Sequence, residues 1–285
     1  MARGQSNVLV DLEAHRDLGT LDAVFPVLHG PYGEDGSVQG LCRVAGIPCV
    51  GAGVLGSAVG MDKDVMKRLL RDAGIPTARF LAVDRAGPAP SFEEAAGALG
   101  APLFVKPANL GSSVGVSKVR TAGEFAEALR LAFRYDTKVV VEEFVDGREI
   151  ECSVLGNDDP VASVPGEVLP THEFYDYEAK YLDEHGAALE IPARLGPGKA
   201  DEVRALAVRA FRVLCCAGMA RVDLFLRPDG GLLVNEINTI PGFTRISMYP
   251  KLWEASGVPY RELVDRLIRL AIERHETERG LQTSV

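Results

Sequence analysis

The chain has 285 residues, which at roughly 150 residues per domain suits two domains or three small ones. Hydrophobic residues make up 47% of it, charged residues 25% and aromatic residues 7%, ordinary values that exclude a collagen, a coiled coil and a disordered chain. The formal net charge is −9 and there is no long run of lysine and arginine, so we expect no nucleic acid and no membrane surface as a partner.

The location of the protein is also constrained by its apolar segments and cysteines. No apolar stretch reaches the roughly 18 to 20 residues that span a bilayer, and the opening segment has only a short apolar run, Val8 to Val10. We therefore expect a cytoplasmic protein. The five cysteines form no CxxC pair and no metal-ligand spacing with histidine, so we expect buried free thiols.

Short β-rich runs alternate with helical segments, which is typical of an α/β or α+β chain. In the first third, predicted strands at 22–29 and 47–50 flank a helix over 36–45, and together these form one βαβ step. A charged amphipathic helix is expected over 61–73.

The middle third predicts a small mixed sheet with two helices. Its strands are expected at 79–83, 102–107, 115–119 and 138–143. Ser91 with Glu94, and Thr121 with Glu124, have the spacing of a capping box, in which the two side chains bind backbone N–H groups at a helix start.

The final third combines a sheet, a long loop and helices. We expect a strand at 149–155, a polar loop at 171–186, a helix at 200–216, a hairpin at 220–238 and two closing helices, the second over 260–274. Loops of this length inside a domain are usually lids or binding loops, and Lys180 and Tyr181 suit a lid over phosphates. An exposed loop without such a role is the alternative.

The hairpin ARVDLFLRPDGGLLVNEIN carries the strongest functional prediction. The Asp-Gly pair at 229–230 is typical of a two-residue turn. That turn makes Asp223 face Glu236 and Arg221 face Asn238, and all four side chains share one face because side chains alternate along a strand. Facing carboxylates need a cation, and two carboxylates with an amide oxygen are ligands that Mg²⁺ prefers. A solvated sheet face with Arg221 as counter-ion is the alternative.

Two further segments have the composition of a nucleotide site. GSSVGVSKV at 111–119 is a Gly/Ser-rich loop preceded by Lys106, and such loops can bind phosphate through backbone N–H groups. It lacks the GKS/T ending and the following helix of a P-loop, and a plain hairpin connection is the alternative. Glu142 and Glu143 end a strand, where a carboxylate could accept from an exocyclic amine such as that of adenine; two solvent-facing acids are the alternative.

A Gly/Pro-bearing loop at 238–250 leads into a helix at about Ser247. Backbone N–H groups at a helix start bind carboxylates, and the Ser247 hydroxyl can add a contact. Ordinary N-capping by Ser247 is the alternative.

Six motifs follow one another in order along the chain. They are HGPYGEDG (29–36), MDK (61–63), FVKPANLGSSVGVSKV (104–119), EFYDYEAKY (173–181), GMARVDLFL (218–226) and NEINTIPGFT (235–244). In this order they resemble the D-alanine–D-alanine ligases of the ATP-grasp superfamily, from about residue 22 to about residue 274.

The resemblance implies an ATP-grasp fold, α/β and α+β in class, with ATP held between the sheets of its last two parts. The implied divisions are an incomplete N-terminal α/β substrate domain over 1–61, a central subdomain over 62–146, and a C-terminal subdomain over 147–285 with the metal and second-substrate sites.

The resemblance also implies roles for individual residues. For ATP these are phosphate contacts from Lys63, Lys106, Ser113 and Lys180, adenine contacts from the Glu142 side chain and the backbone of Glu143 and Val145, and a ribose contact from Glu149. For the substrates they are His29 and Ser112 at the first D-alanine, Tyr181 in a network with Ser112, and Ser247 and Met248 at the second. Arg221 and a backbone N–H near Gly242 are implied to stabilise developing charge, and Asp223, Glu236 and Asn238 to ligate Mg²⁺ or Mn²⁺, with two divalent ions.

The implied reaction makes D-alanyl-D-alanine for peptidoglycan precursor synthesis. One D-alanine carboxylate attacks the γ-phosphate of ATP, and the amine of a second D-alanine then displaces phosphate from the D-alanyl phosphate. The implied partners are the small-molecule substrates ATP and D-alanine, and a second copy in a homodimer. Related ligases that take D-lactate or D-serine as second substrate are the alternative.

One family feature has no match in this sequence. Members begin with a strand and a Gly-rich turn whose Glu contacts the amino group of the first substrate. We therefore expect either a start that lies upstream of Met1 or an ATP-binding but catalytically impaired fragment.

Overall fold

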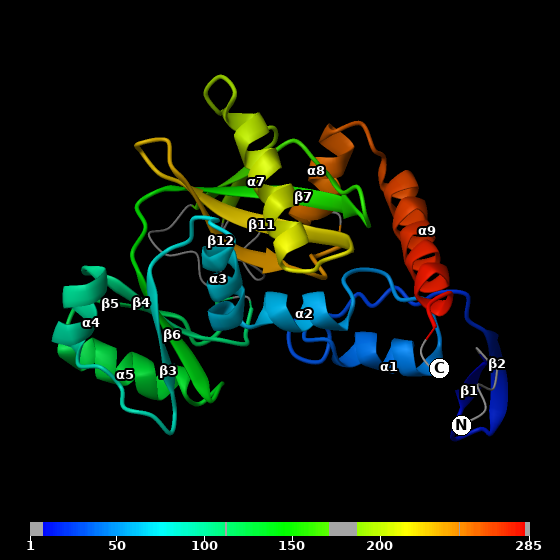
Figure 1. The fold of residues 1–285 in the computed structure, drawn as a ribbon, viewed down its shortest axis with the longest axis horizontal. Coiled ribbons are helices and arrows are strands. Elements are labelled where there is room, and N and C mark those ends of the chain that lie inside the picture. Colours follow the sequence, from blue (N-terminus) through cyan, green and yellow to red (C-terminus); the bar gives the residue numbers. More distant parts are fainter. Residues whose placement is uncertain (1–7, 112, 171–186, 245, 283–285) are drawn as a thin grey trace.

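The computed structural model describes residues 8–111, 113–170, 187–244 and 246–282. The first elements along the chain are β1 (Val8–Asp11), β2 (Arg16–Thr20), α1 (Ser37–Ala45), α2 (Val54–Met61) and α3 (Lys63–Asp72). β1 and β2 pair antiparallel and lie apart at one end of the molecule (Figure 1). No helix in the described ranges is long and apolar enough to cross a membrane.

The two strands predicted on either side of α1 are wrong, although α1 itself is confirmed. A single parallel bridge joins Val24 to Cys49, with the Val24 N–H donating to the Pro48 carbonyl at 2.8 Å and the Val50 N–H donating to Val24 at 2.9 Å. Pro26 and Pro48 have no N–H group to donate, so the ladder cannot extend into two strands.

The helix predicted over 61–73 is interrupted at Asp62. This residue has an extended backbone, and its Oδ1 accepts from the N–H groups of Asp64 and Val65, both at 3.1 Å. Asp62 is therefore the N-cap of α3, and it separates α3 from α2. Lys63 consequently lies in the first turn of a new helix, where a cap fixes the backbone.

The central sheet has four strands in the order β3-β6-β4-β5. Its elements are β3 (Phe80–Asp84), α4 (Phe92–Leu99), β4 (Leu103–Pro107), β5 (Ser117–Val119), α5 (Ala122–Ala132) and β6 (Lys138–Glu143). The two predicted helices are confirmed, but the sheet is not mixed, because β6 enters between β3 and β4 and runs antiparallel to both. Phe125 and Ala128 of α5 pack on Val105 and Val141 of the sheet.

Both segments with a predicted capping box begin a helix, but only the box at α4 is complete. At α4 the Ser91 Oγ accepts from Glu94 N at 3.2 Å, and Glu94 Oε2 accepts from Ser91 N at 2.8 Å, so the box is complete. At α5 the Thr121 hydroxyl accepts from Glu124 N, but the Glu124 carboxylate accepts from Arg120 N at 2.6 Å, one residue earlier than predicted.

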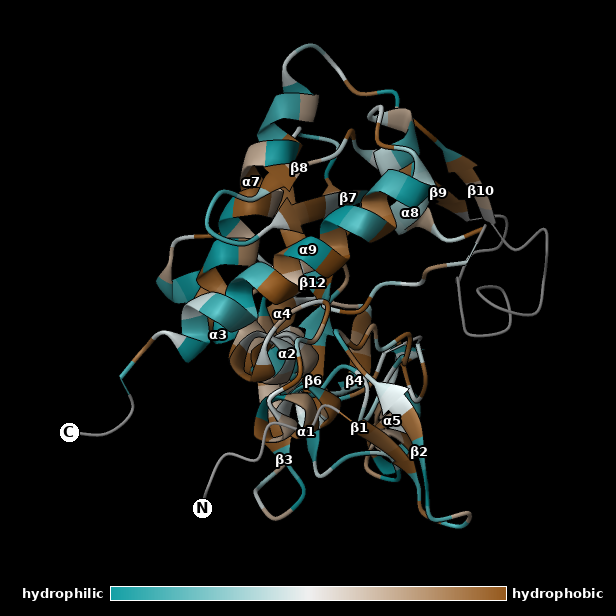
Figure 2. Ribbon diagram, turned by 90° about the vertical axis from the view of Figure 1, so that its right-hand side faces the viewer, coloured by the Kyte–Doolittle hydropathy of each residue, from teal (hydrophilic) through white to brown (hydrophobic). Residues whose placement is uncertain are grey.

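The C-terminal sheet has six strands in the order β10-β9-β7-β11-β12, with β8 on β7. Its elements are β7 (Arg148–Gly156), β8 (Val161–Ala162), β9 (Gly166–Pro170), β10 (Ala187–Glu190), α7 (Lys199–Val213), β11 (Gly218–Leu226), β12 (Leu232–Asn238), α8 (Met248–Ala255) and α9 (Tyr260–Arg279). Val154 packs in the core that α7 covers, whereas its neighbour Leu155 packs with α8 and α9, so the sheet is covered on both faces. Helix α9 carries both hydrophilic and hydrophobic residues (Figure 2), and its buried residues Leu263, Leu267 and Ala271 recur every four positions, as in an amphipathic helix.

The hairpin of β11 and β12 contains the predicted residue pairs, but its turn differs from the prediction. Arg221 pairs with Asn238 and Asp223 with Glu236. The turn is one residue longer than predicted, because Arg227 N donates to Gly231 O at 2.9 Å, and a bulge at Asn235 restores the register.

Helix α3 packs on this C-terminal sheet. Met66 and Leu70 are fully buried in the same core as α7 and the strands β7 and β11. Lys63 and Lys67, on the same helix, are nearly or fully buried. In Figure 1, α3 lies between the two sheets, so its side chains can reach both.

Candidate functional site

The four side chains predicted to share a face of the β11–β12 hairpin lie together. The Arg221 guanidinium forms a bidentate pair with Asp223, with Nε and Nη2 each 2.7 Å from a carboxylate oxygen. Asn238 Nδ2 donates to Asp223 Oδ2 at 2.9 Å. Lys63 Nζ lies 3.8 Å from Glu236 Oε2, which brings helix α3 to the same face.

Glu151 belongs to this group and was not found by sequence reasoning. Glu151 lies on β7, where it pairs with Asp223 of the neighbouring strand β11. Its Oε2 lies 2.9 Å from Arg221 Nε. Burial would lower the pKa of Arg221, but Asp223 and Glu151 raise it well above its ordinary value. The alternation of Glu149 and Glu151 along a strand was visible in the sequence, but the pairing of β7 with β11 was not.

The donor set of this face fits Mg²⁺. Asp223 and Glu236 carry carboxylate oxygens, and the hydrogen bond from Asn238 uses its amide nitrogen rather than the amide oxygen that the prediction assigns to a metal. Hard divalent ions prefer such oxygen donors. In the part of the chain that the structure describes, no three His, Cys, Asp or Glu side chains form a metal-binding group, so the predicted set consists of two carboxylates and one amide.

Glu142 lies between two lysines, and the alternative of a solvent-facing acid is wrong for it. Its Oε2 accepts from Lys106 Nζ at 2.7 Å, and its Oε1 lies 3.2 Å from Lys67 Nζ. The residue is only 2% exposed. Burial would raise the pKa of Glu142, but Lys106 and Lys67 outweigh it and lower that pKa to about 2. A contact of Glu142 with adenine stays a prediction.

The two lysines respond to burial in opposite ways. For Lys106, burial is the largest single effect and would lower the pKa, but the charge and hydrogen bond of Glu142, together with the charges of Glu236 and Glu149, outweigh it and raise that pKa. For Lys67, which is fully buried, burial lowers the pKa more than Glu142 raises it, and the charge of Lys106 adds to the decrease. Lys67 was not singled out from the sequence, although it lies one helical turn after Lys63.

Glu143 joins the end of β6 to Arg79. Its carboxylate accepts from Arg79 Nε at 2.6 Å and from Arg79 N at 2.8 Å, and its own N–H donates to Arg79 O at 3.0 Å. The backbone N–H of Glu143 is therefore already used within the protein. The rings of Phe104 and Phe144 stack beside it, with centroids 6.2 Å apart, and Lys118 Nζ lies 4.4 Å from the Phe144 centroid.

Loop 29–36 contacts the loop that follows β12. His29 Nδ1 lies 3.0 Å from Ile240 O. Glu34, which belongs to the HGPYGEDG motif and had no predicted role, accepts from Gly30 N at 2.7 Å and from Ile240 N at 3.4 Å. Burial raises the pKa of the Glu34 carboxyl, and these bonds and the His29 charge offset the increase only in part. His29 is thus held next to the loop that leads to Gly242.

Ser247 is the N-cap of α8, but its side chain caps none of the described N–H groups. Its Oγ accepts instead from Thr244 N at 3.0 Å and lies 2.9 Å from Thr244 Oγ1. A Cβ built on Gly242 would lie only 2.7 Å from this hydroxyl, so a larger residue there would displace the Ser247 side chain. The hydroxyl therefore faces the loop of Gly242, and Met248, which follows it, is buried.

Three predicted residues, Ser112, Lys180 and Tyr181, lie outside the described residues, as does the predicted lid at 171–186. Ser113 is described and has a positive φ of 60°. Val145 lies between β6 and β7, and Glu149 is the second residue of β7. The roles of all these residues stay predictions.

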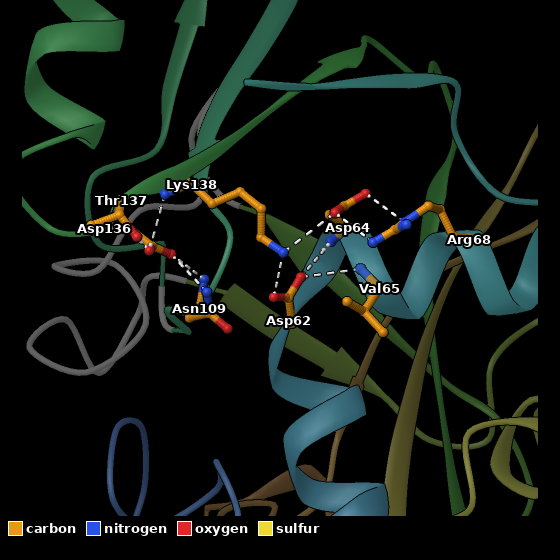
Figure 3. A network of polar contacts seen from close by, with 8 residues as sticks. All are labelled: Asp62, Asp64, Val65, Arg68, Asn109, Asp136, Thr137 and Lys138. Carbon is orange, nitrogen blue, oxygen red and sulfur yellow. Dashed lines mark hydrogen bonds and ion pairs between the residues drawn. The ribbon is translucent and has the colours of Figure 1, made fainter. Parts of the chain in front are cut away.

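A polar network ties β6 to the start of α3 (Figure 3). Lys138 Nζ lies 2.6 Å from Asp62 Oδ2 and 3.3 Å from Asp64 Oδ2. Asp136, two residues before Lys138, accepts from the backbone and side chain of Asn109. The residue that precedes Lys63 is therefore fixed to the central sheet.

Two antiparallel sheets, one with carboxylates and Arg221 and the other with Lys106 and Glu142, with helix α3 and its buried lysines between them, define an ATP-grasp enzyme. Residues 2–52 match the family model for the D-ala D-ala ligase N-terminus, and residues 69–269 match that for the C-terminus. The chain belongs to the D-alanine–D-alanine ligase family, whose members are ATP-dependent ligases.

Named relatives agree with this membership. D-alanine–D-alanine ligase A of Escherichia coli K12 is 55% identical over 278 residues, which are 97% of this chain and 76% of that protein. The D-alanine–D-alanine ligase of Bacillus anthracis complexed with ATP is 32% identical with a TM-score of 0.78, covering 90% of this chain and 81% of that one. The VanG D-Ala:D-Ser ligase of Enterococcus faecalis is 38% identical with a TM-score of 0.81, covering 93% and 79%.

Proposed function

We propose that this chain joins two D-alanine molecules to D-alanyl-D-alanine at the expense of ATP, for peptidoglycan precursor synthesis. The observation that carries the proposal is the row of Asp223, Glu236 and Asn238 beside Arg221, facing Lys63 of α3. The 55% identity to the E. coli ligase supports the choice of substrates.

The nucleotide lies between the two sheets in this proposal. Lys63 and Lys106 contact its phosphates, with Ser113 and Lys180 as further contacts. The Glu142 side chain and the backbone of Glu143 and Val145 contact adenine, and Glu149 contacts the ribose. The low pKa of Glu142 keeps it an acceptor at neutral pH, which is what an exocyclic amine requires.

In the first step, a carboxylate oxygen of one D-alanine attacks the γ-phosphorus of ATP, and the bond from that phosphorus to the bridging oxygen breaks. ADP leaves with the electron pair, and D-alanyl phosphate forms. His29 and Ser112 hold this D-alanine, with Tyr181 in their network. Arg221, fixed by two carboxylates, donates to the phosphoryl oxygens as they gain charge.

In the second step, the neutral amine of the other D-alanine attacks the acyl carbon and forms the C–N bond, the bond from that carbon to the phosphate oxygen breaks, and the departing phosphate takes the proton that the nitrogen loses. Ser247 and the backbone of Met248 hold the carboxylate of this D-alanine, where the start of α8 favours an anion. A backbone N–H near Gly242 and Arg221 stabilise the oxyanion of the tetrahedral intermediate.

Asp223, Glu236 and Asn238 would hold Mg²⁺ or Mn²⁺, with two ions in the loaded enzyme. When bound, the metal neutralises phosphate charge and orients the γ-phosphoryl group. We also propose that the protein is cytoplasmic and forms a homodimer, which light scattering at several protein concentrations tests.

The test is a coupled measurement of products. The purified chain is incubated with ATP, Mg²⁺ and D-alanine, and phosphate release is compared with dipeptide formed, measured by mass spectrometry. We expect equal amounts of the two. Parallel reactions replace half of the D-alanine with D-serine or D-lactate, because the VanG neighbour is a D-Ala:D-Ser ligase. If the mixed product exceeded D-alanyl-D-alanine, the preferred second substrate would be D-serine or D-lactate rather than D-alanine. ATP binding without phosphate release would instead support the alternative that this chain binds ATP but does not catalyse the ligation.

A further inference from the structure

Lys67 is a charged side chain with no exposed surface, on the buried side of α3. Its Nζ donates to Thr77 Oγ1 at 2.9 Å, lies 3.2 Å from Glu142 Oε1, and is 5.9 Å from the centroid of the Phe80 ring. A buried ammonium group is costly unless it is paired, so these contacts keep Lys67 in place.

Glu142 connects Lys67 to the phosphate-binding lysine of the proposed site. One carboxylate oxygen faces Lys67, and the other accepts from Lys106 Nζ at 2.7 Å. The three groups come from α3, β6 and β4, so the contact joins the helix to both strands. Lys67 lies on the far side of Glu142 from Lys106, and in this arrangement it acts on ATP only through Glu142.

The charges of Lys67, Glu142 and Lys106 explain why a second lysine is needed. Two ammonium groups and one carboxylate leave one positive charge. Without Lys67, Glu142 and Lys106 would form a closed pair with no net charge, and the attraction for a polyphosphate would fall. Electrostatic interactions are strong here because Lys67 and Glu142 are buried and the Lys106 side chain is only 14% exposed, so water screens them poorly.

We propose that Lys67 is a positioning residue of the nucleotide site, which shares Glu142 with Lys106 so that Lys106 keeps a positive charge for the phosphates of ATP. This inference rests on the proposed function of the same site, because that function assigns Lys106 to the phosphates.

The test compares two nucleotides that differ in their phosphates. Dissociation constants of AMP-PNP and AMP are measured by calorimetry without D-alanine, so a failure of the ligase reaction does not affect the result. We expect Lys67→Met to weaken AMP-PNP about tenfold and AMP less than twofold. Lys199→Met is the matched control, because it removes the same charge from a lysine paired with Glu202 on α7 and leaves both constants unchanged.

A double variant shows whether Lys67 acts through Glu142. In the double variant Lys67→Met with Glu142→Gln, only Lys106 of the three groups keeps a charge, so the net charge is again one positive charge. The ratio of the dissociation constants of AMP-PNP and AMP should therefore return to within about threefold of the wild-type ratio. Equal weakening of both nucleotides by Lys67→Met, or no recovery in the double variant, would overturn the proposal.

A milder variant covers the case in which Lys67→Met does not fold, which its circular dichroism melt would show. Thr77→Val removes only the hydroxyl that holds Lys67. We expect it to weaken AMP-PNP two- to threefold and to leave the KM for D-alanine unchanged. Wild-type AMP-PNP binding by a folded Thr77→Val protein would contradict the inference.

Discussion

Glu236 faces Asp223 across two hydrogen-bonded strands, and this pair is costly without a cation. Glu236→Gln removes one carboxylate from the proposed metal set. We expect turnover to fall at least about hundredfold, because a metal that stabilises transferring charge is lost, while the melting temperature stays the same or rises slightly. Phosphate release and thermal unfolding measure the two effects.

Asp229→Asn provides the control for this prediction. Asp229 lies in the turn of the same hairpin, where its carboxylate contacts Arg227 and accepts from Gly231 N at 2.9 Å. It is far along the strands from the carboxylate row, so its loss should not change turnover. Undiminished phosphate release by Glu236→Gln would remove Glu236 from the metal set.

The acid stability of the protein depends on Glu142. Its pKa is about 2 in the folded protein against an ordinary value of 4.5, so the unfolded chain binds the proton first as the pH falls. The stabilising contribution of the Glu142 carboxylate is therefore complete above about pH 4.5 and is lost between pH 4.5 and 2.

Urea unfolding at pH 5 and at pH 3 measures this loss. Glu142→Gln has no proton to gain at this position, so its free energy of unfolding should fall less between the two pH values than that of the wild type. An equal fall in both proteins would assign the acid sensitivity to other carboxylates.

At the scale of the elements, α4 depends on its capping box. Ser91→Ala removes the acceptor for Glu94 N, and we expect a loss of about 1 kcal/mol in the free energy of unfolding. Ser91→Asp keeps an acceptor and should restore most of the stability. Because α4 packs on the central sheet through Ala95 and Leu99, away from the proposed metal ligands, turnover should not change. A loss in Ser91→Asp equal to that in Ser91→Ala would contradict the capping role.

The sequence predicted elements well where one local rule decided them. The capping spacing placed α4 and α5, and alternation placed Arg221 and Asp223 on one face. The turn of the hairpin was wrong by one residue, and the bulge at Asn235 compensated for it, so the predicted pairs are correct for an incomplete reason.

Contacts between distant segments were beyond local rules. Glu151 reaches Arg221 only because β7 pairs with β11, and Lys67 reaches Glu142 only because α3 packs between two sheets. The family motifs named the residues expected to touch ATP and D-alanine. They gave no information about side chains such as Glu34 and Lys67 that hold those residues in place.

At the scale of the whole molecule, Lys138 joins the central sheet to the helix that packs on the C-terminal sheet. Lys138→Met leaves Asp62 and Asp64 without this partner, although Asp64 keeps Arg68. We expect a loss of about 1 to 3 kcal/mol in the free energy of unfolding, measured in urea. Lys199→Met is again the control, because its ion pair lies within α7 and its one further hydrogen bond in the described residues goes to Gly230 O in the hairpin turn, away from the central sheet. Equal losses in the two variants would show that the Lys138 contact contributes no more than an ordinary surface pair.

The two ion pairs between β6 and α3 have opposite polarity. Lys138 at the start of the strand meets Asp62, and Glu142 four residues later meets Lys67. If the helix docked in the reverse direction, Lys138 would face Lys67 and Glu142 would face Asp62, so both contacts would be repulsive. The order of charges thus permits one orientation of the strand on the helix during folding. A sequence in which both pairs were exchanged together would keep that orientation, whereas exchanging one pair would remove the distinction between the two directions.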